Sequence, residues 1–88
     1  MNETQDVRKF TEPVAATLNF YLPRGETVTR EWPTKPPDLD KLTRAVFDSL
    51  EAAGIIENDS LIVRLDTFKR YDDDHPAGVS IYLRKITI

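Results

Sequence analysis

The spacing of apolar residues predicts a strand in the first quarter of the chain. From residue 14 to residue 22, apolar side chains occupy every second position, which is the period of a strand with one buried face. The residues on the apolar side are Val14, Ala16, Leu18, Phe20 and Leu22. The segment that follows, residues 23–37, contains four prolines and Gly25 and is therefore predicted to be a loop.

A second apolar pattern, with spacings of three and four residues, predicts a helix from about Asp38 to Ala53. Prolines stand just before this segment, Asp38 is available as the N-cap, and Gly54 ends the pattern. The apolar stripe, with Phe47 at its margin, consists of Leu39, Leu42, Val46, Leu50 and Ala53.

The remaining segments predict an α+β fold in a single domain, residues 1–88. Residues 1–12 lack periodicity and are predicted to be flexible. Residues 60–71 are predicted to be a strand, and residues 78–88 its hairpin partner across the turn 72–77. The expected order is β-loop-α-β-β, a small mixed sheet with one main helix packed on one face.

Composition excludes several classes of function. A chain of 88 residues has room for one small domain. It contains no cysteine, which excludes disulfides, thiolate zinc sites and a thiol nucleophile. No stretch approaches the roughly 18 apolar residues of a membrane span, and no signal peptide is recognisable, so a cytoplasmic location and no membrane partner are expected.

The charge is concentrated in one part of the chain. The net charge of −3 argues mildly against DNA binding. Residues 36–59, however, carry six acids and two bases, so most of the acidity surrounds the predicted helix. Bound divalent cations would offset such a local excess.

Three aspartates lie where a divalent cation could be held. Asp38 and Asp40 follow two prolines, where the chain should still be extended, and side chains two apart in an extended segment point the same way. Arg44 lies one helical turn beyond Asp40 and can reach the same place. Asp59 stands at the head of the next strand. Because magnesium prefers carboxylate oxygens, this set suggests a metal-dependent phosphodiesterase.

The same residues also have ordinary structural explanations, and the sequence leaves both interpretations open. An aspartate at a helix N-terminus is commonly a cap, and Asp59 beside Asn58 can belong to a turn. Arg44 and Asp48 are one turn apart and can form a surface ion pair.

Two features outside this segment are interpreted as structural. The run from Asp72 to His75 is predicted to be a solvated loop rather than a metal site. Trp32, in the proline-rich loop, is predicted to cover the core, with a base-stacking platform as the alternative.

The chain resembles the RusA-type Holliday junction resolvases from about Lys35 to its end. No single motif is specific, but the ordered set with its spacing is. The residues that carry the resemblance are Pro37-Asp38-Leu39-Asp40-Lys41-Leu42 with Arg44, the helix Ala45–Leu50, Asn58-Asp59 in place of a family Asp-Asp pair, Lys69 with Tyr71, and Gly78-Val79-Ser80-Ile81.

This resemblance implies a RusA-like, magnesium-dependent endodeoxyribonuclease that resolves four-way DNA junctions by paired symmetric nicks. It makes Asp38, Asp40 and Asp59 the Mg²⁺ ligands and catalytic acids, with Arg44 as a further catalytic residue. It also implies a homodimer on branched DNA and, because many members are so encoded, a phage or prophage origin. The cations expected to hold DNA phosphates are Lys41, Lys69, Arg70, Lys35 and Arg30.

The chain departs from the family pattern at three positions. Lys41 stands where the family has asparagine, Arg44 where it has lysine, and Asn58 where it has aspartate. An arginine does not release its proton near neutral pH, so Arg44 can stabilise negative charge but cannot act as an acid or base. The alternative is therefore a resolvase-like domain that binds branched DNA or a protein partner without cleavage. A third possibility is a small interaction module with no nucleic-acid role.

Overall fold

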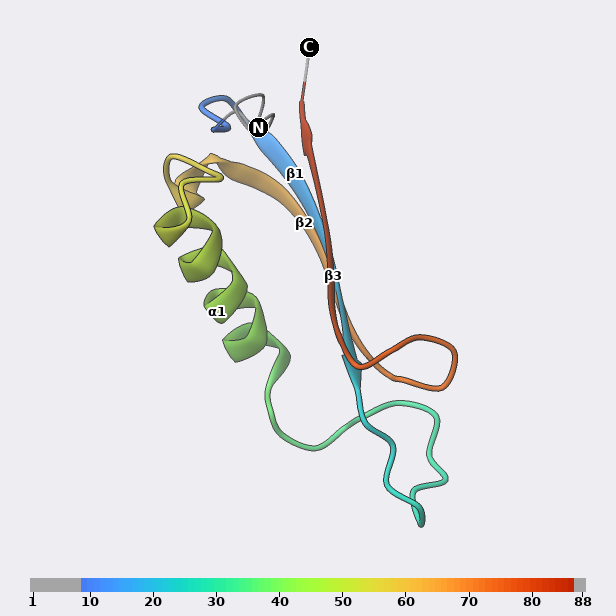
Figure 1. Ribbon diagram of the computed structural model, residues 1–88. Coiled ribbons are helices and arrows are strands. Elements are labelled where there is room, and N and C mark those ends of the chain that lie inside the picture. The colour runs from blue at the N-terminus through green and yellow to red at the C-terminus, as the bar shows by residue number, and fades with distance from the viewer. Residues whose placement is uncertain (1–8, 87–88) are drawn as a thin grey trace, which may run out of the picture.

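The computed structural model describes residues 9–86 and has the α+β fold expected from the sequence (Figure 1). The predicted first strand is confirmed at both ends, and the predicted helix is one residue shorter at each end. Its elements are β1 (Val14–Leu22), α1 (Leu39–Ala52), the 3₁₀ turn η2 (Asp59–Leu61), β2 (Ile62–Tyr71) and β3 (Gly78–Lys85). Because η2 occupies residues 59–61, the second strand begins two residues later than predicted.

The order of the strands differs from the prediction. The three strands form one sheet in the order β2-β1-β3, with β1 parallel to β2 and antiparallel to β3. The predicted hairpin between the last two strands is therefore wrong, because β1 lies between them. The physical reason is burial: Val14, Ala15, Ala16 and Leu18 are all buried on β1, and a strand this apolar gains most from the central position.

Helix α1 covers one face of the sheet, as Figure 1 shows, and closes the core between them. Val46 and Leu50 of the helix pack against Leu18 and Phe20 of β1, and Ile56 completes this cluster. Thr43 is the buried polar residue of the helix, and its hydroxyl shares a hydrogen bond of 3.0 Å with Thr67 on β2. The hydrogen bond satisfies a polar group that would otherwise destabilise the helix–sheet contact.

Order in the chain begins before β1. The sequence predicted a flexible end through residue 12, and residues 1–8, like residues 87 and 88 of the predicted last strand, lie outside the described part. Phe10, however, donates its N–H to the carbonyl of Ile55 at 2.9 Å and accepts from the N–H of Glu57 at 3.0 Å. The side chain of Phe10 also packs against the core, so this short bridge closes one end of the domain.

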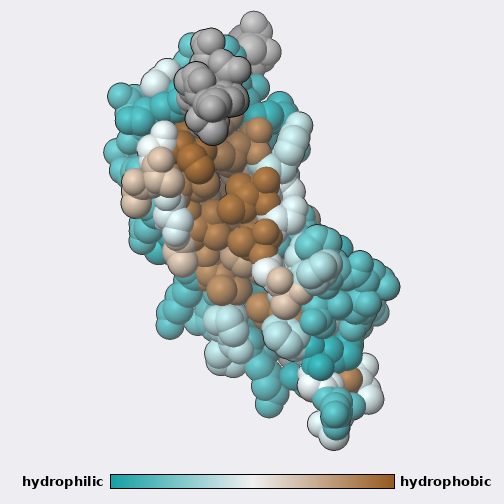
Figure 2. All heavy atoms as spheres, viewed as in Figure 1, coloured by the Kyte–Doolittle hydropathy of each residue, from teal (hydrophilic) through white to brown (hydrophobic). Residues whose placement is uncertain are grey.

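An apolar groove remains open between α1 and β3. Figure 2 shows apolar side chains gathered in a band between the helix and the sheet. The groove has a volume of about 370 Å³, and Val79 and Ile81 of β3 lie in it while remaining more than 40% exposed. Helix α1 therefore leaves the β3 side of this face uncovered. Among residues 9–86, no helix is long and apolar enough to span a membrane.

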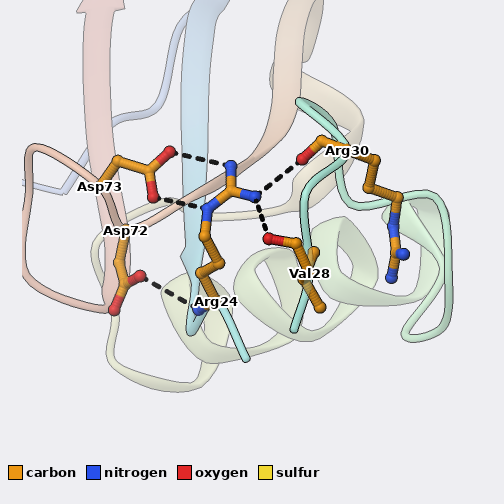
Figure 3. Close-up of polar contacts among 5 residues, drawn as sticks. All are labelled: Arg24, Val28, Arg30, Asp72 and Asp73. Carbon is orange, nitrogen blue, oxygen red and sulfur yellow. Dashed lines mark hydrogen bonds and ion pairs between the residues drawn. The ribbon is translucent and has the colours of Figure 1, made fainter. Parts of the chain in front are cut away.

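Arg24 fastens the proline-rich loop to the turn between β2 and β3 (Figure 3). Its guanidinium donates to both carboxylate oxygens of Asp73, at 2.7 and 2.9 Å, and to the carbonyls of Val28 and Arg30, at 3.1 and 2.8 Å. Its backbone N–H donates to Asp72 at 3.2 Å. The acidic run predicted to be a solvated loop thus has a structural partner.

This contact makes the order of the loop depend on pH. The hydrogen bond from Arg24 lowers the pKa of Asp73 below its ordinary value of 3.8. A lowered pKa means that the contact is fully present above pH 3.8 and is lost as the pH falls through the lower, folded-state pKa. Amide exchange of residues 24–30, corrected for the intrinsic pH dependence of exchange, is therefore expected to accelerate below that pH in the wild type. In Asp73→Asn it should already be fast at neutral pH, whereas Asp74→Asn should behave as wild type; identical profiles for all three would contradict the assignment.

Candidate active site

Asp38 lies in an extended segment, as the sequence predicted, but Asp40 lies inside α1, so the prediction that the two aspartates share an extended segment is wrong. The backbone of Asp38 has φ −72° and ψ 145°, and it occupies the N-cap position of α1. Its side chain makes no capping hydrogen bond, so its carboxylate is not used to satisfy the helix end. Its nearest charged partner is the Lys41 ammonium at 3.8 Å, an exposed contact that contributes little. The carboxylate is therefore available to a ligand.

Asp40 and Arg44 lie on the face of α1 that borders β2. Asp40 is in the first turn of the helix, and Arg44 follows one turn later. Both line a groove of about 420 Å³ between α1 and β2, whose other lining residues are Leu39, Thr43, Phe47, Leu65 and Thr67. The lining of this groove is mainly apolar, whereas Asp40 and Arg44 are exposed at its edge.

Asp59 is brought to Arg44 by the return of the chain after α1. The guanidinium of Arg44 lies 3.4 Å from the carboxylate of Asp59, and the predicted alternative pair with Asp48 is not formed among the ion pairs of residues 9–86. Asn58 supplies the local turn chemistry instead, because its side chain accepts the N–H of Ser60 at 2.8 Å. The Asp59 carboxylate is thus not needed for the local turn and can pair with Arg44, 15 residues earlier in the chain.

Arg44 therefore contacts one of the three predicted acids and lines the same groove as a second. It shares the α1–β2 groove with Asp40 and pairs with Asp59, while Asp38 stands at the helix N-cap and contacts Lys41. Within residues 9–86, no three acidic or histidine side chains are grouped closely enough to hold a metal ion together. The donor chemistry nevertheless suits magnesium, which takes one or two protein carboxylates and completes its shell with water and phosphate oxygens.

Lys69 has a role in this region that the sequence did not indicate. Its ammonium donates to the carbonyls of Lys35 and Pro37, both at 3.0 Å. Lys69 on β2 thereby holds the extended segment that carries Asp38 against the sheet. Its predicted contact with DNA stays a prediction, but two of its three donors are already engaged with the backbone.

Replacement of Lys69 by methionine is expected to release this segment. The apolar stem is retained while both hydrogen bonds are lost, so protease cleavage within residues 33–38 should increase and the NMR order parameters of Thr34, Lys35 and Asp38 should fall, while the thermal midpoint changes little. Arg64→Met, on the same strand but away from the loop, is the matched control. Unchanged cleavage and order parameters within residues 33–38 in Lys69→Met would show that the two hydrogen bonds do not order the segment.

The other cations predicted to contact DNA are placed on two sides of the molecule. Lys41 is exposed at the N-terminus of α1, and Arg30 and Lys35 are exposed on the proline-rich loop that leads into it. Arg70 lies with Trp32 and Phe68, 6.0 and 5.4 Å from their ring centroids. Trp32 is half-exposed there and does not cover the core, so that prediction is wrong.

Two side-chain pairs at this end of the sheet could not be predicted from the sequence. The Arg24–Asp73 pair joins residues 49 positions apart, and no local pattern marks such a contact. His75, which the sequence left without a partner, stacks on Tyr21 with ring centroids 3.8 Å apart and an interplanar angle of 12°. An isolated histidine beside a proline in a turn gives no signal for a stacking partner on a distant strand.

Comparison with known proteins identifies the family of this chain. Residues 1–84 match the family described as Endodeoxyribonuclease RusA, whose members resolve Holliday junctions and are generally dependent on divalent metal ions. No curated protein and no solved structure matches the chain. Because the match covers nearly the whole sequence, this chain belongs to the RusA family of endodeoxyribonucleases.

Proposed function

We propose that this protein is a magnesium-dependent endonuclease that resolves four-way DNA junctions by paired symmetric nicks. The observation that carries the proposal is the position of Arg44, which pairs with Asp59 and shares a groove with Asp40. An exposed cation that pairs with one of these acids and lines a groove with another suits a phosphate whose negative charge increases during hydrolysis. Membership of the family supports the same reaction.

The proposed roles follow from the chemistry of each side chain. Asp38, Asp40 and Asp59 offer the oxygen ligands, and bound magnesium would polarise the scissile phosphate and lower the pKa of a coordinated water. Arg44 stabilises the negative charge on the phosphate oxygens. It stays protonated at every relevant pH, so it neither donates nor accepts a proton in the reaction.

DNA phosphates are proposed to approach along the N-terminal end of α1. Lys41, Lys35 and Arg30 are exposed there, close in sequence to the aspartates, and would offset the repulsion between these acids and the DNA backbone. Contacts of this kind recognise shape and not sequence, and the affinity should fall steeply with salt concentration. A cytoplasmic location is part of the proposal, and a phage or prophage origin stays a prediction.

Paired nicks require two active sites, so we propose a homodimer. The apolar groove between α1 and β3 is the surface that a second copy would cover, because Val79 and Ile81 are exposed there beside buried core residues. Ile81→Glu is expected to lower the mass measured by sedimentation from dimer to monomer. The matched control is Val63→Glu, an exposed apolar residue on β2. A dimer that persists in Ile81→Glu would place the interface elsewhere.

The test of the proposed reaction is cleavage of a synthetic four-way junction labelled on each strand in turn. Symmetric nicks that require magnesium, with linear duplex left uncut, would support the proposal. Calcium in place of magnesium should permit junction binding without hydrolysis. A junction left uncut at every magnesium concentration, by protein that is folded and binds it, would exclude the nuclease activity.

One observation favours a second candidate, a resolvase-like domain that binds branched DNA without cutting it. Asp59 is paired with Arg44, and the three aspartates do not form one cluster within residues 9–86. The ion pair with Arg44 competes with a metal ion for the Asp59 carboxylate. The two candidates are separated by the same assay, because the second predicts junction binding in calcium and no nicks in magnesium.

A further inference from the structure

The face of the sheet opposite α1 is open and has a composition unlike the rest of the protein. Strand register places the alternate residues of the three strands on this face, which no helix covers in Figure 1. We call it the open sheet face. Its residues are Thr17, Asn19 and Tyr21 of β1, Arg64, Asp66, Phe68 and Arg70 of β2, and Ser80, Tyr82 and Arg84 of β3.

This face is positively charged although the chain is acidic. It carries three arginines and one aspartate, whereas the whole chain has a net charge of −3. The aspartate, Asp66, lies 3.9 Å from Arg64 in an exposed pair, so Arg70 and Arg84 remain in excess. A cationic face on an acidic protein attracts a polyanion to one side of the molecule.

Aromatic rings lie between these arginines. Tyr82 is 60% exposed and Phe68 is 42% exposed. Arg70 lies over the Phe68 ring, which positions its charge beside an apolar plane. An exposed sheet with alternating rings and arginines offers both the stacking surface and the phosphate contacts that single-stranded nucleic acids need.

The open sheet face ends in a cavity that adds further aromatic rings to it, although acids also line the cavity. The cavity has a volume of about 340 Å³ and contains Trp32, 52% exposed, together with Arg70, Tyr21 and His75. The Nε of Arg70 is buried there without a hydrogen-bond partner, so the site has a donor left to satisfy. Its acids are Glu31, Asp73 and Asp74, of which Asp73 is neutralised by Arg24.

We propose that the open sheet face and this cavity bind single-stranded DNA, including nucleotides that become unpaired at the branch point of the DNA substrate. The inference rests on the proposed function for the identity of the polymer, but it concerns a surface separate from the aspartates on α1 and η2. Paired bases inside a duplex are stacked on their neighbours and cannot reach Tyr82 or Phe68, whereas unpaired bases can. Because every base has an aromatic plane, the binding should tolerate any sequence.

The test uses a fluorescently labelled twelve-nucleotide oligothymidine, titrated in EDTA so that no metal site contributes. Tyr82→Ala is expected to weaken the affinity about tenfold through loss of one stacked base. Arg84→Gln should reduce the slope of log affinity against log salt by about 0.7, whereas Lys85→Gln, next in sequence and on the opposite face, should leave it unchanged. Fluorescence of Trp32, the single tryptophan, should be quenched on binding.

The outcomes separate this inference from the nuclease proposal. Cleavage of junctions without binding of oligothymidine would overturn the inference and leave the proposed function intact. Binding that loses its affinity in Tyr82→Ala, in a protein that cuts no junction, would support the inference alone. Equal losses in Arg84→Gln and Lys85→Gln would show non-specific attraction and overturn it. A change of oligomeric state in Tyr82→Ala, with oligothymidine affinity unchanged, would mark the face as a protein interface and also overturn it.

Discussion

Asp40→Asn is expected to lower the rate of junction cleavage by about a thousandfold, because loss of a charged metal ligand removes several kcal/mol of stabilisation from the transition state. Asparagine keeps the size of the side chain and still suits the first helical turn, so the fold should be unaffected. Junction affinity in calcium should be unchanged or slightly higher, since one negative charge near the DNA is removed. The measurement is single-turnover cleavage in magnesium, with binding followed separately by mobility shift.

Asp48→Asn is the control for this experiment. Asp48 is an exposed aspartate on the same helix, and it makes no ion pair within residues 9–86 that involves Arg44. The control variant should cut as fast as the wild type. If both variants cut equally well, Asp40 would have no part in the reaction, and its position at the rim of the α1–β2 groove would be explained by helix capping charge alone.

The second large effect concerns the core. Leu18→Ala is expected to destabilise the protein by about 2–5 kcal/mol, because the side chain is fully buried at the centre of β1 and its removal leaves a cavity. Small domains have total stabilities of about 5–15 kcal/mol, so this loss is a large fraction of the stability and should lower the urea midpoint clearly. Urea denaturation followed by circular dichroism measures the change.

Val63→Ala provides the comparison for the core variant. Val63 is an apolar residue on β2 and is 62% exposed, so its truncation should change the stability by less than about 0.5 kcal/mol. A loss in Val63→Ala as large as that in Leu18→Ala would mean that a partner buries the edge of the sheet. In that case the stability would depend on protein concentration.

The helix and the first strand could be predicted because their signals are local. The alternation from Val14 to Leu22 and the stripe through Val46 and Leu50 each depend on residues a few positions apart. Consecutive strands usually form hairpins, and this preference gives the wrong order of the strands here. A usable signal was present, because β1 is apolar on both faces near Ala15 whereas β2 carries charges along its length, and the least charged strand belongs in the middle.

The site was predicted in part. The extended conformation at Asp38 could be expected from the two prolines before it, and the turn chemistry of Asn58 from its residue type. The pairing of Arg44 with Asp59 depends on how residues 53–58 return the chain to the sheet, and no pattern in the sequence fixes that path. The hydrogen bonds of Lys69 to the loop carbonyls could not be predicted for the same reason, since β2 and the loop come together only in the folded chain.

The central position of β1 has a consequence for how the protein folds. Val14 pairs with both Ile62 and Lys85, so neither edge of β1 can be satisfied by residues close to it in sequence. On the ribosome, β1 is synthesised before β2 and β3. Its hydrogen bonds can therefore be completed only after almost all of the described chain has emerged. Contacts this distant in sequence favour slow folding, and the apolar strand remains exposed meanwhile to other chains and to chaperones.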